Sequence, residues 1–184
     1  MERPQPVAAR IPFDGSWLEA GWYTDEGFTP RPTFRLDAGW HGVQVAPGFF
    51  DVQYEPGTPH VVAVQFARPI RFRRAPAEAV AATSAAEAIA LLGVNTSLQR
   101  FGSGPGELAG MRGWQTTVEP ALEWETPVLD AAAGTIGLLP GRRLQLYLLD
   151  SPEGLLGVLV GGSASGWATA AAMAAPILAS LRLG

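Results

Sequence analysis

The sequence of 184 residues contains no cysteine and no lysine, and it has only two histidines. The lack of cysteine excludes disulfide bonds, thiolate catalysis, and zinc or iron–sulfur sites built on thiolates. The lack of lysine excludes Schiff-base chemistry and the phosphate-binding lysine of P-loop proteins. All 13 basic residues are therefore arginine, which is typical of a source with biased base composition or of a thermostable protein.

Charged residues are scarce, at 16% of the chain, and the formal net charge is −4 at pH 7. A chain with this balance has no overall basic surface, so we expect no nucleic-acid partner. Hydrophobic residues make up 47% of the chain, which is enough for one sizeable core at this length. We therefore expect a flexible N-terminal arm at residues 1–15 and a single domain at residues 16–184.

Two segments bear on the location of the protein. Residues 1–13 lack the charged and then apolar pattern of an export signal, so we expect a cytoplasmic chain or one whose signal has been removed. Between Glu153 and Arg182 no charged residue occurs, and a run of this length could span a bilayer. The Gly-, Ser- and Ala-rich break at residues 161–166 argues against a membrane helix. We expect no transmembrane span and leave proximity to a membrane open.

The C-terminal quarter predicts two strands followed by a helix. Leu144, Leu146 and Leu148 lie at every second position, as in a strand with one face in the core. A Pro- and Gly-containing turn then leads into an apolar run that is typical of a strand covered on both faces. Residues 167–181 place apolar side chains at helical spacing, and a serine at position 163 or 165 is expected to cap this helix.

The first third of the chain is rich in short strand patterns separated by Pro and Gly. Residues 33–36 and 40–45 flank a turn at residues 37–39, which predicts a hairpin. Residues 49–54 and 60–66 predict two further strands. An antiparallel meander is therefore expected in this part of the chain.

One internal helix is predicted over residues 85–92, where Ser84 begins a capping box. Beyond it we expect a glycine loop at residues 102–106 and an irregular acidic segment at residues 119–133. Residues 135–139 are expected to pair with the C-terminal hairpin. The predicted fold class is therefore α+β, an antiparallel sheet sandwich with one internal helix and a C-terminal helix.

Four short motifs occur in a suggestive order: AGWYT at residues 20–24, FRLDAGW at 34–40, LAGMRGW at 108–114 and ILASLRL at 177–183. Together they resemble the PsbP/Mog1-like α/β/α sandwich of small extracytoplasmic proteins of actinobacterial and chloroflexal type. The resemblance implies an assembly or scaffolding factor, a lipoprotein, or a protein without known activity, outside the cytoplasm. It implies no catalytic residue. The sequence departs from that group in showing neither an export signal nor a lipobox cysteine, so a place outside the cytoplasm is expected only if such a segment has been removed.

His41 and His60 lie on neighbouring predicted strands, with Asp51 between them in sequence. Two imidazoles and a carboxylate suit zinc or iron if their side chains converge. This spacing matches no known ligand motif, and two histidines at strand ends explain the same residues. We therefore expect no metal and no other cofactor, and we keep these three residues as the alternative metal site.

Arg71 and Arg73 belong to an arginine cluster at residues 68–74, interleaved with apolar residues. Such guanidinium groups could hold a phosphate, a lipid head group or an acidic partner. The alternative is a solvated strand end before the internal helix.

Aromatic residues concentrate in the first third of the chain, where short strands are not expected to bury every ring. Exposed rings stack on sugars or form a protein interface, whereas the alternative is that most of these rings fill the core. The predicted ligand-binding residues are Trp22, Tyr23, Trp40, His41, Phe49, Tyr54, Arg71 and Arg73.

These features favour a non-enzymatic binding or assembly protein outside the cytoplasm, which binds a protein partner or a small ligand through an aromatic-rich surface. One alternative is a small metal-dependent or hydrolytic enzyme that uses His41, His60 and Asp51. A second alternative is a structural subunit that assembles with itself.

Overall fold

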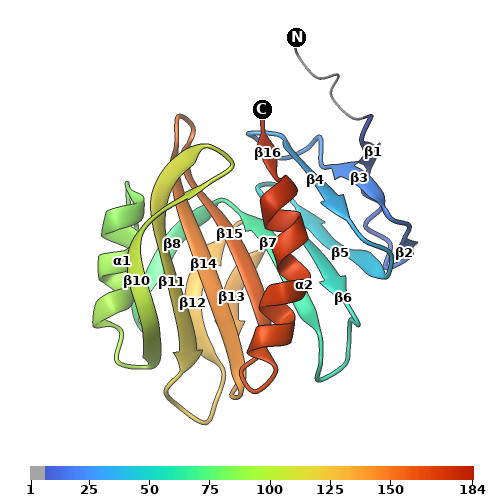
Figure 1. Ribbon diagram of the computed structural model, residues 1–184. Helices are drawn as coiled ribbons and strands as arrows, with labels where there is room; N and C mark the ends of the chain where they lie inside the picture. Colours follow the sequence, from blue (N-terminus) through green and yellow to red (C-terminus); the bar gives the residue numbers. More distant parts are fainter. Residues whose placement is uncertain (1–6) are drawn as a thin grey trace.

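The computed structural model describes residues 7–184, which contain three β-sheets and two α-helices (Figure 1). The largest sheet has eight strands in the order β10-β11-β14-β15-β7-β6-β5-β2, and every neighbouring pair in it is antiparallel. Its strands are β2 (Trp17–Leu18), β5 (Trp40–Ala46), β6 (Phe49–Tyr54), β7 (Val62–Ala67), β10 (Leu98–Leu108), β11 (Met111–Pro120), β14 (Arg142–Ser151) and β15 (Gly154–Ser163).

Two four-stranded sheets pack on the large sheet. The first, in the order β1-β3-β4-β16, consists of β1 (Ala9–Arg10), β3 (Gly21–Thr24), β4 (Pro32–Leu36) and β16 (Arg182–Leu183). The second, in the order β13-β12-β8-β9, consists of β8 (Pro69–Ala75), β9 (Glu78–Val80), β12 (Thr126–Ala131) and β13 (Gly134–Leu138). Within the described residues, β1 with β3 is the one parallel pair.

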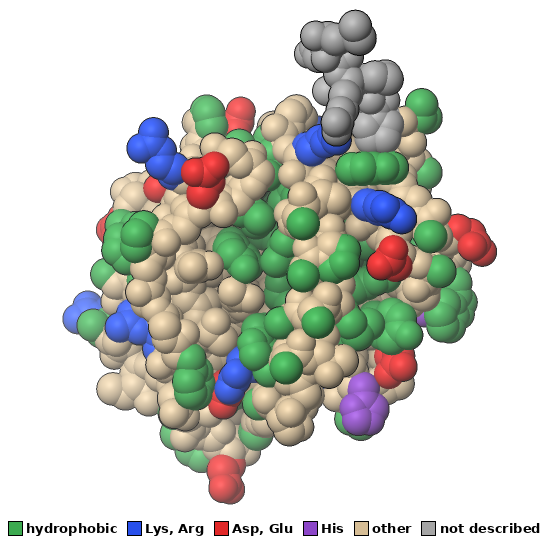
Figure 2. Space-filling view, viewed as in Figure 1, with side chains coloured by type: hydrophobic (Ala, Val, Ile, Leu, Met, Phe, Trp, Pro, Cys, Tyr) green, Lys and Arg blue, Asp and Glu red, His purple; other side chains and the backbone are tan. Residues whose placement is uncertain are grey.

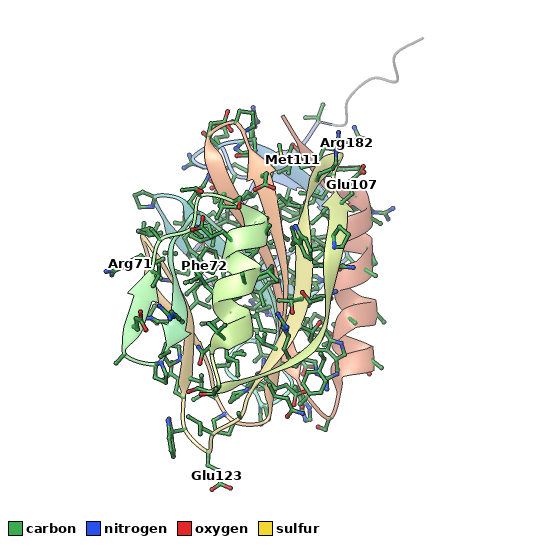
Figure 3. The ribbon with its side chains drawn as sticks, turned by 90° about the vertical axis from the view of Figure 1, so that its left-hand side faces the viewer. Arg71, Phe72, Glu107, Met111, Glu123 and Arg182 are labelled. Atoms are coloured by element: carbon green, nitrogen blue, oxygen red, sulfur yellow. The ribbon has the colours of Figure 1, made fainter. Side chains whose placement is uncertain are left out.

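The two helices lie on opposite faces of the large sheet. Helix α2 (Trp167–Ser180) packs on β15, β7 and β4, while α1 (Ala85–Val94) packs on β8, β11 and β14. Figures 1 and 3 show this arrangement, with α2 in front of the sheet in the first view and α1 in front in the second. The molecule is thus a sandwich of antiparallel sheets with one internal and one C-terminal helix, and the predicted α+β fold class is confirmed.

The core is divided by the large sheet into two clusters. On the α2 side, the Phe50 and Phe66 rings stack at a centroid distance of 4.5 Å, and Phe34 from β4 stacks on Phe66 at 5.4 Å. On the α1 side, Phe72 and Leu92 pack with the leucines of β14. Burying each of these side chains stabilises the fold by about 1.5–3 kcal/mol, so both faces of the sheet contribute to stability.

The predicted C-terminal strands and helix are present as β14, β15 and α2. The predicted serine cap of α2 is wrong, because Gly166 is the N-cap and no side chain accepts a hydrogen bond from the first turn. Ser163 and Ser165 instead form a hydrogen bond with each other, with 2.9 Å between their Oγ atoms. The amide groups at the start of α2 are therefore left without a side-chain partner among the described residues.

Glycine lets α2 approach the sheet closely. A Cβ atom on Gly162 of β15 would lie 2.5 Å from the Cβ of Ala170 in α2, far inside van der Waals contact. Because both positions lack a larger side chain, the helix packs directly on the backbone of the strand. The small residues Gly162 and Ala170 therefore set the distance between helix and sheet.

The predicted hairpin of residues 33–36 and 40–45 is wrong, although both segments are strands. Strand β4 pairs with β3 and β16, whereas β5 pairs with β2 and β6 in the large sheet. The turn at residues 37–39 therefore carries the chain from one sheet to another. A turn motif reverses the chain direction, but long-range partners decide which strands share hydrogen bonds.

The predicted glycine loop at residues 102–106 is also wrong. These residues belong to β10, which pairs with β11 over ten residue pairs and has one register shift between Phe101 and Ser103. Thr116 of β11 donates its hydroxyl to the carbonyl oxygen of Gly102, at 2.9 Å, beside this shift. The glycines thus mark an irregular edge strand, which is one of the places where glycine occurs in sheets.

The acidic segment at residues 119–133 is more regular than expected, because residues 126–131 form β12. β13 pairs with β12, so the expected pairing of residues 135–139 with the C-terminal hairpin is wrong. The predicted strands 49–54 and 60–66 agree with β6 and β7, except that His60 lies in the turn before β7.

The described part of the predicted N-terminal arm, residues 7–15, is attached to the fold. Ala9 and Arg10 pair with β3, and Ile11 is only 2% exposed. The amide of Gly15 donates a hydrogen bond to the carbonyl oxygen of Gly42, at 3.0 Å. The first six residues of the predicted arm lie outside the described residues.

The internal helix is confirmed, and it extends two residues further than predicted. The hydroxyl of Ser84 accepts a hydrogen bond from the amide of Glu87, as the capping box requires. The Glu87 carboxylate reaches back to the amide and hydroxyl of Thr83, one residue before the cap. Asp150 of β14 accepts a hydrogen bond from the amide of Ala85, at 2.8 Å, and thereby joins the helix to the large sheet.

Candidate functional site

A groove of about 370 Å³ lies where the turn between β6 and β7 meets the end of β15 and the first turns of α2. Its apolar side is formed by Val62, Ala170 and Met173. Its polar side is formed by Tyr54, Glu55, His60, Ser163, Gly166 and Thr169. A volume of this size falls at the lower end of the range for small-molecule sites.

The β6–β7 turn that forms one wall is held by its own hydrogen bonds. The hydroxyl and amide of Thr58 both donate to the carbonyl oxygen of Glu55, and the hydroxyl of Thr58 accepts from the amide of His60. Arg142 of β14 donates to the carbonyl oxygens of Pro59 and Val61, at 3.1 and 2.7 Å. The turn is therefore fixed to the sheet, and His60 has a defined place at the groove.

Glu55 has a backbone φ of +50°, which a residue with a side chain adopts only at some cost in free energy. This conformation begins the turn and sets the position of the carboxylate at the groove. Gly166, the uncapped N-terminus of α2, lines the same groove. A negative charge near a helix N-terminus is favourable, because the partial positive charge of the helix lies there.

The Tyr54 side chain is held in place by packing against residues of the neighbouring strand β5 and of the turn before it. Its ring meets that of Trp40 edge to face, with 6.0 Å between the ring centroids. A Cβ on Gly39 would come within 2.9 Å of the Tyr54 ring, so the ring lies directly against the backbone there. The Tyr54 side chain is thus a rigid wall of the groove.

Hydrophobic side chains gather on this face of the molecule. In the space-filling view they follow α2 and the strip beside it, and few charged side chains interrupt them (Figure 2). The groove therefore combines an apolar floor with a carboxylate, an imidazole and hydroxyl groups at its rim. Such a site suits a small molecule with an apolar body and a hydrogen-bonding head group.

Most of the aromatic residues predicted to bind a ligand lie in the core. Tyr23, Trp40 and Phe49 are 8%, 3% and 3% exposed, so they cannot form a surface. Trp22 is half-buried, and the guanidinium of Arg182 lies over its ring, 5.0 Å from the centroid. The aromatic-rich surface expected from the sequence is therefore not formed, because short strands of two sheets bury the rings between them. Tyr54 is the aromatic residue of this set that lines the groove.

The three residues of the alternative metal site do not converge. His41 is buried, and its Nδ1 lies 2.8 Å from the carbonyl oxygen of Gly15. Asp51 forms hydrogen bonds with Gln53 and Gln65, and His60 is exposed at the groove. Within residues 7–184, no group of three or more His, Cys, Asp or Glu side chains is placed to hold one metal ion.

The guanidinium groups of Arg71 and Arg73, both on β8, contact the carboxylate of Asp130 on the neighbouring β12. Arg73 donates to Oδ1 of Asp130 at 2.5 Å, and Nη2 of Arg71 lies 3.2 Å from Oδ2 of the same carboxylate. Burial raises the pKa of Asp130, but hydrogen bonds from Thr135 and Arg73 and the charges of both arginines outweigh it, so the pKa is lowered overall. In Figure 3 Arg71 points away from the molecule while Phe72, next in β8, points inward.

The arginine cluster is therefore occupied by partners within the chain. Arg73 is mostly buried against Asp130, and Arg74 forms an exposed ion pair with Glu78. These contacts leave less positive charge for a phosphate or an acidic partner than the sequence suggested.

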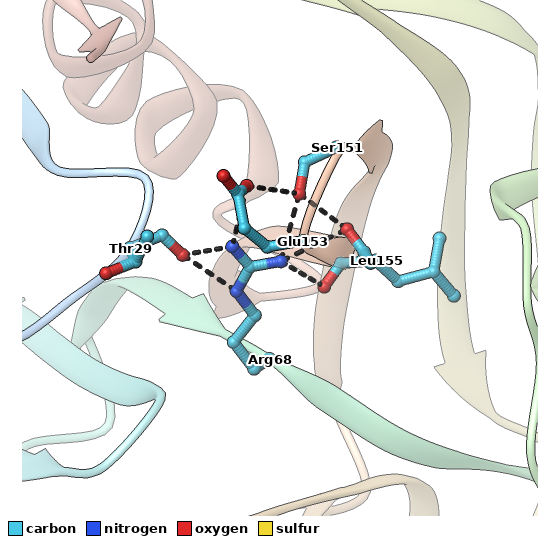
Figure 4. Close-up of polar contacts among 6 residues, drawn as sticks. Thr29, Arg68, Ser151, Glu153 and Leu155 are labelled. Atoms are coloured by element: carbon cyan, nitrogen blue, oxygen red, sulfur yellow. Dashed lines mark hydrogen bonds and ion pairs between the residues drawn. The ribbon is translucent and has the colours of Figure 1, made fainter.

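Arg68, the first member of this cluster, links three loops of the chain (Figure 4). Its guanidinium donates to the carbonyl oxygen of Thr29, to the hydroxyl of Ser151, and to the carbonyl oxygens of Gly154 and Leu155. It also lies 3.7 Å from a carboxylate oxygen of Glu153. This structural role was missed from the sequence, because it depends on three loops that meet only in the folded chain.

No family model and no curated protein matches the chain. Among solved structures, the chain is similar to cyanobacterial PsbP (CyanoP) from Synechocystis sp. PCC 6803, with 15% identity and a TM-score of 0.48, over 89% of this chain and 92% of that one. It is also similar to LpqN of Mycobacterium tuberculosis, described as involved in cell envelope biogenesis, with 11% identity and a TM-score of 0.44, over 97% and 90% of the two chains.

The predicted resemblance to PsbP-like proteins is thus found again among solved structures. The likeness concerns the arrangement of strands and helices along the chain. Among the described residues, no helix is both long enough and apolar enough to cross a membrane.

Proposed function

We propose that this protein is a non-enzymatic binding protein, and that its ligand is a small amphipathic molecule held in the groove between the β6–β7 turn and α2. The observation that carries the proposal is the groove itself, about 370 Å³ in volume, with an apolar floor and a polar rim. Its walls are preformed, because Arg142 fixes the turn and Trp40 fixes the Tyr54 ring. A preformed site loses little conformational entropy when a ligand binds.

Each wall supplies a distinct contact. The Tyr54 ring and Met173 offer flat or adaptable apolar surface for the body of a ligand. His60, Glu55 and Thr169 offer hydrogen bonds to its head group. This combination favours a ligand with an aromatic or aliphatic body and one polar end.

The polar groups at the rim favour binding over catalysis. A nucleophilic hydroxyl must lie within hydrogen-bond reach of a base. The hydroxyl of Ser163 bonds to Ser165, and no hydrogen bond links it to His60 within residues 7–184. Among the described residues, the groove therefore has hydrogen-bonding groups but no serine hydroxyl that is hydrogen-bonded to a base.

Ligand-observed NMR with a library of small amphipathic molecules tests this proposal. We expect a subset of the library to bind the wild-type chain. Thr169→Trp should weaken these ligands at least about tenfold, because the new ring fills the groove from the exposed side of α2. Ala172→Trp is the matched control, since Ala172 is exposed on the same helix and does not line the groove.

Two results would overturn the proposal: a library without any ligand for the wild-type chain, or ligands that bind Thr169→Trp as tightly as Ala172→Trp. His60→Ala separates the roles within the groove. We expect it to weaken ligands with a polar head group by about 3–10-fold, the loss of one hydrogen bond, and to leave purely apolar ligands unchanged.

The location outside the cytoplasm and an assembly role with a protein partner are part of this proposal and are tested separately. Fractionation of the native source would place the protein in the envelope or in the cytoplasm. Recovery of the chain from the envelope fraction is the result expected here.

A further inference from the structure

A second groove lies on the opposite face of the large sheet, under β13. It has a volume of about 240 Å³ and is lined by Gln44 and Phe49 from β5 and β6, Gln65 from β7, Glu125, and residues 133–137. A smaller groove of about 160 Å³ shares Gln65, Ile136 and Gly137 with it and continues along β13. Together they form an elongated site that is separated from the first groove by the thickness of the sheet.

Asp51 lies beneath this groove. In the antiparallel ladder it stands opposite Gln44 on one side and opposite Gln65 on the other, and both glutamines line the groove. Gln65 and Gln53 donate their side-chain amides to Oδ2 of Asp51, at 3.1 and 2.8 Å. The carboxylate is therefore one hydrogen bond away from the groove.

The other oxygen of this carboxylate has no hydrogen-bond partner among the described residues. Asp51 is 2% exposed, and its Oδ1 is buried without a hydrogen bond from the described residues. An unsatisfied buried carboxylate oxygen costs several kcal/mol in principle, so such groups are rare unless a ligand or water satisfies them. Burial raises the pKa of Asp51, and the hydrogen bonds from Gln53 and Gln65 offset this in part.

A second carboxylate stands at the rim. A Cβ atom on Gly137 would lie 2.7 Å from Oε1 of Glu125, so the Glu125 side chain lies against the backbone of β13. Among residues 7–184, neither Asp51 nor Glu125 forms an ion pair. The wide part of the groove therefore has two carboxylates and two amides but no arginine among the described residues of its lining, whereas Arg142 and Arg143 line the narrow continuation.

We propose that this groove binds a small molecule bearing a primary ammonium group, with Asp51 as the buried anchor and Glu125 at the rim. An ammonium group supplies the positive charge and the hydrogen-bond donors that the site lacks. Gln44 is exposed at the groove and stands opposite Asp51 in the ladder, and the proposal requires its side chain to move aside so that the ligand reaches Oδ1. The aliphatic part of the ligand lies in the wide part of the groove, along Phe49 and Ile136 and away from the two arginines of the continuation.

The probe for this proposal is putrescine, a four-carbon diamine, compared with 1,4-butanediol at the same ionic strength. Two-dimensional ¹⁵N–¹H NMR of the full chain follows the side-chain amide signals of Gln44, Gln53 and Gln65. We expect saturable shifts of these signals with putrescine and none with the diol, because only the diamine carries a positive charge. Equal shifts with both compounds would overturn the ammonium assignment.

Three variants locate the binding. Asp51→Asn should weaken putrescine at least tenfold, and Glu125→Gln about threefold, because they remove the buried and the rim charge. Glu123→Gln is the control for general electrostatic attraction, since Glu123 points away from the molecule at the end of the same loop (Figure 3). Equal effects of Glu123→Gln and Asp51→Asn would overturn the site.

A fourth variant keeps the proposal testable if Asp51→Asn does not fold. Gln44→Arg places a guanidinium directly opposite Asp51 in the ladder, where it acts as a built-in ligand. We expect this variant to abolish putrescine binding and to raise the unfolding temperature. Putrescine binding that survives in Gln44→Arg would contradict the proposal. Neither experiment depends on the groove beside α2.

Discussion

Nε of Arg68 donates a hydrogen bond to the carbonyl oxygen of Thr29 at 2.8 Å, and this contact joins the loop between β3 and β4 to the junction of β7 and β8. The rest of the guanidinium reaches the turn between β14 and β15, where Ser151 and Leu155 accept hydrogen bonds (Figure 4). The same group lies 5.9 Å from the ring centroid of the buried Phe28. One side chain thus holds two sheets together through their loops.

Arg68→Ala should therefore lower the free energy of unfolding by about 3 kcal/mol, because it leaves several carbonyl oxygens without a donor at once. The measurement is equilibrium unfolding in urea. Arg74→Ala is the matched control, since the Arg74 pair with Glu78 is exposed on both sides and should contribute less than about 1 kcal/mol. Similar losses in the two variants would show that the Arg68 contacts do not stabilise the fold.

The ion pairs of Asp130 predict a dependence of stability on pH. The pKa of Asp130 in the folded protein lies below its ordinary value of 3.8, since hydrogen bonds from Thr135 and Arg73 outweigh the effect of burial. A carboxyl group with a lowered pKa stabilises the fold at pH values above about 3.8, and this contribution is lost as the pH falls through the folded pKa.

Asp130→Asn should accordingly destabilise the protein by about 3 kcal/mol at pH 7, because Arg73 loses its charged partner in a mostly buried place. The difference from wild type should shrink when unfolding is measured near pH 3. Glu78→Gln serves as an exposed control at both values. A gap between Asp130→Asn and wild type that stays constant between pH 7 and pH 3 would contradict this account.

The contact between Gly162 and Ala170 predicts a steric effect. Gly162→Ala should cost about 1–3 kcal/mol, because the new methyl group would lie 2.5 Å from the Cβ of Ala170 and α2 must move away from β15. Gly161→Ala is the neighbouring control, since its Cβ would meet Ala63 and Leu144 at an ordinary 3.8 Å. The measurement is the thermal unfolding temperature of both variants. Equal unfolding temperatures would show that α2 can move away from β15 without loss of stability.

The sequence predicted a local feature well where all of the groups that form it lie within one short segment. The cap of α1 could be predicted because the Ser84 hydroxyl accepts a hydrogen bond from the amide of Glu87, only three residues away. The alternation of Leu144, Leu146 and Leu148 predicted β14, since side chains of a strand alternate between its faces. The α+β class followed from these patterns.

The sites could not be predicted in the same way. The groove beside α2 needs the turn at His60 and the helix at Thr169, which are more than a hundred residues apart in the sequence. The set of predicted ligand-binding residues included Tyr54 but not Thr169. The sequence does not indicate which surface a threonine on a helix faces. Asp51 was considered as a metal ligand, whereas its distinguishing feature, an unpaired buried oxygen, depends on the strands that enclose it.

By itself, the sequence determined which segments form the two helices and several of the strands, the lack of cysteine and lysine chemistry, and the α+β class. These depend on composition and on contacts a few residues apart. Only the tertiary structure decided that β4 and β5 join different sheets, that Trp40 and Phe49 are buried, and that Arg73 is neutralised by Asp130. Each of these depends on competition between distant segments for the same hydrogen bonds, space and charges, which no local pattern contains.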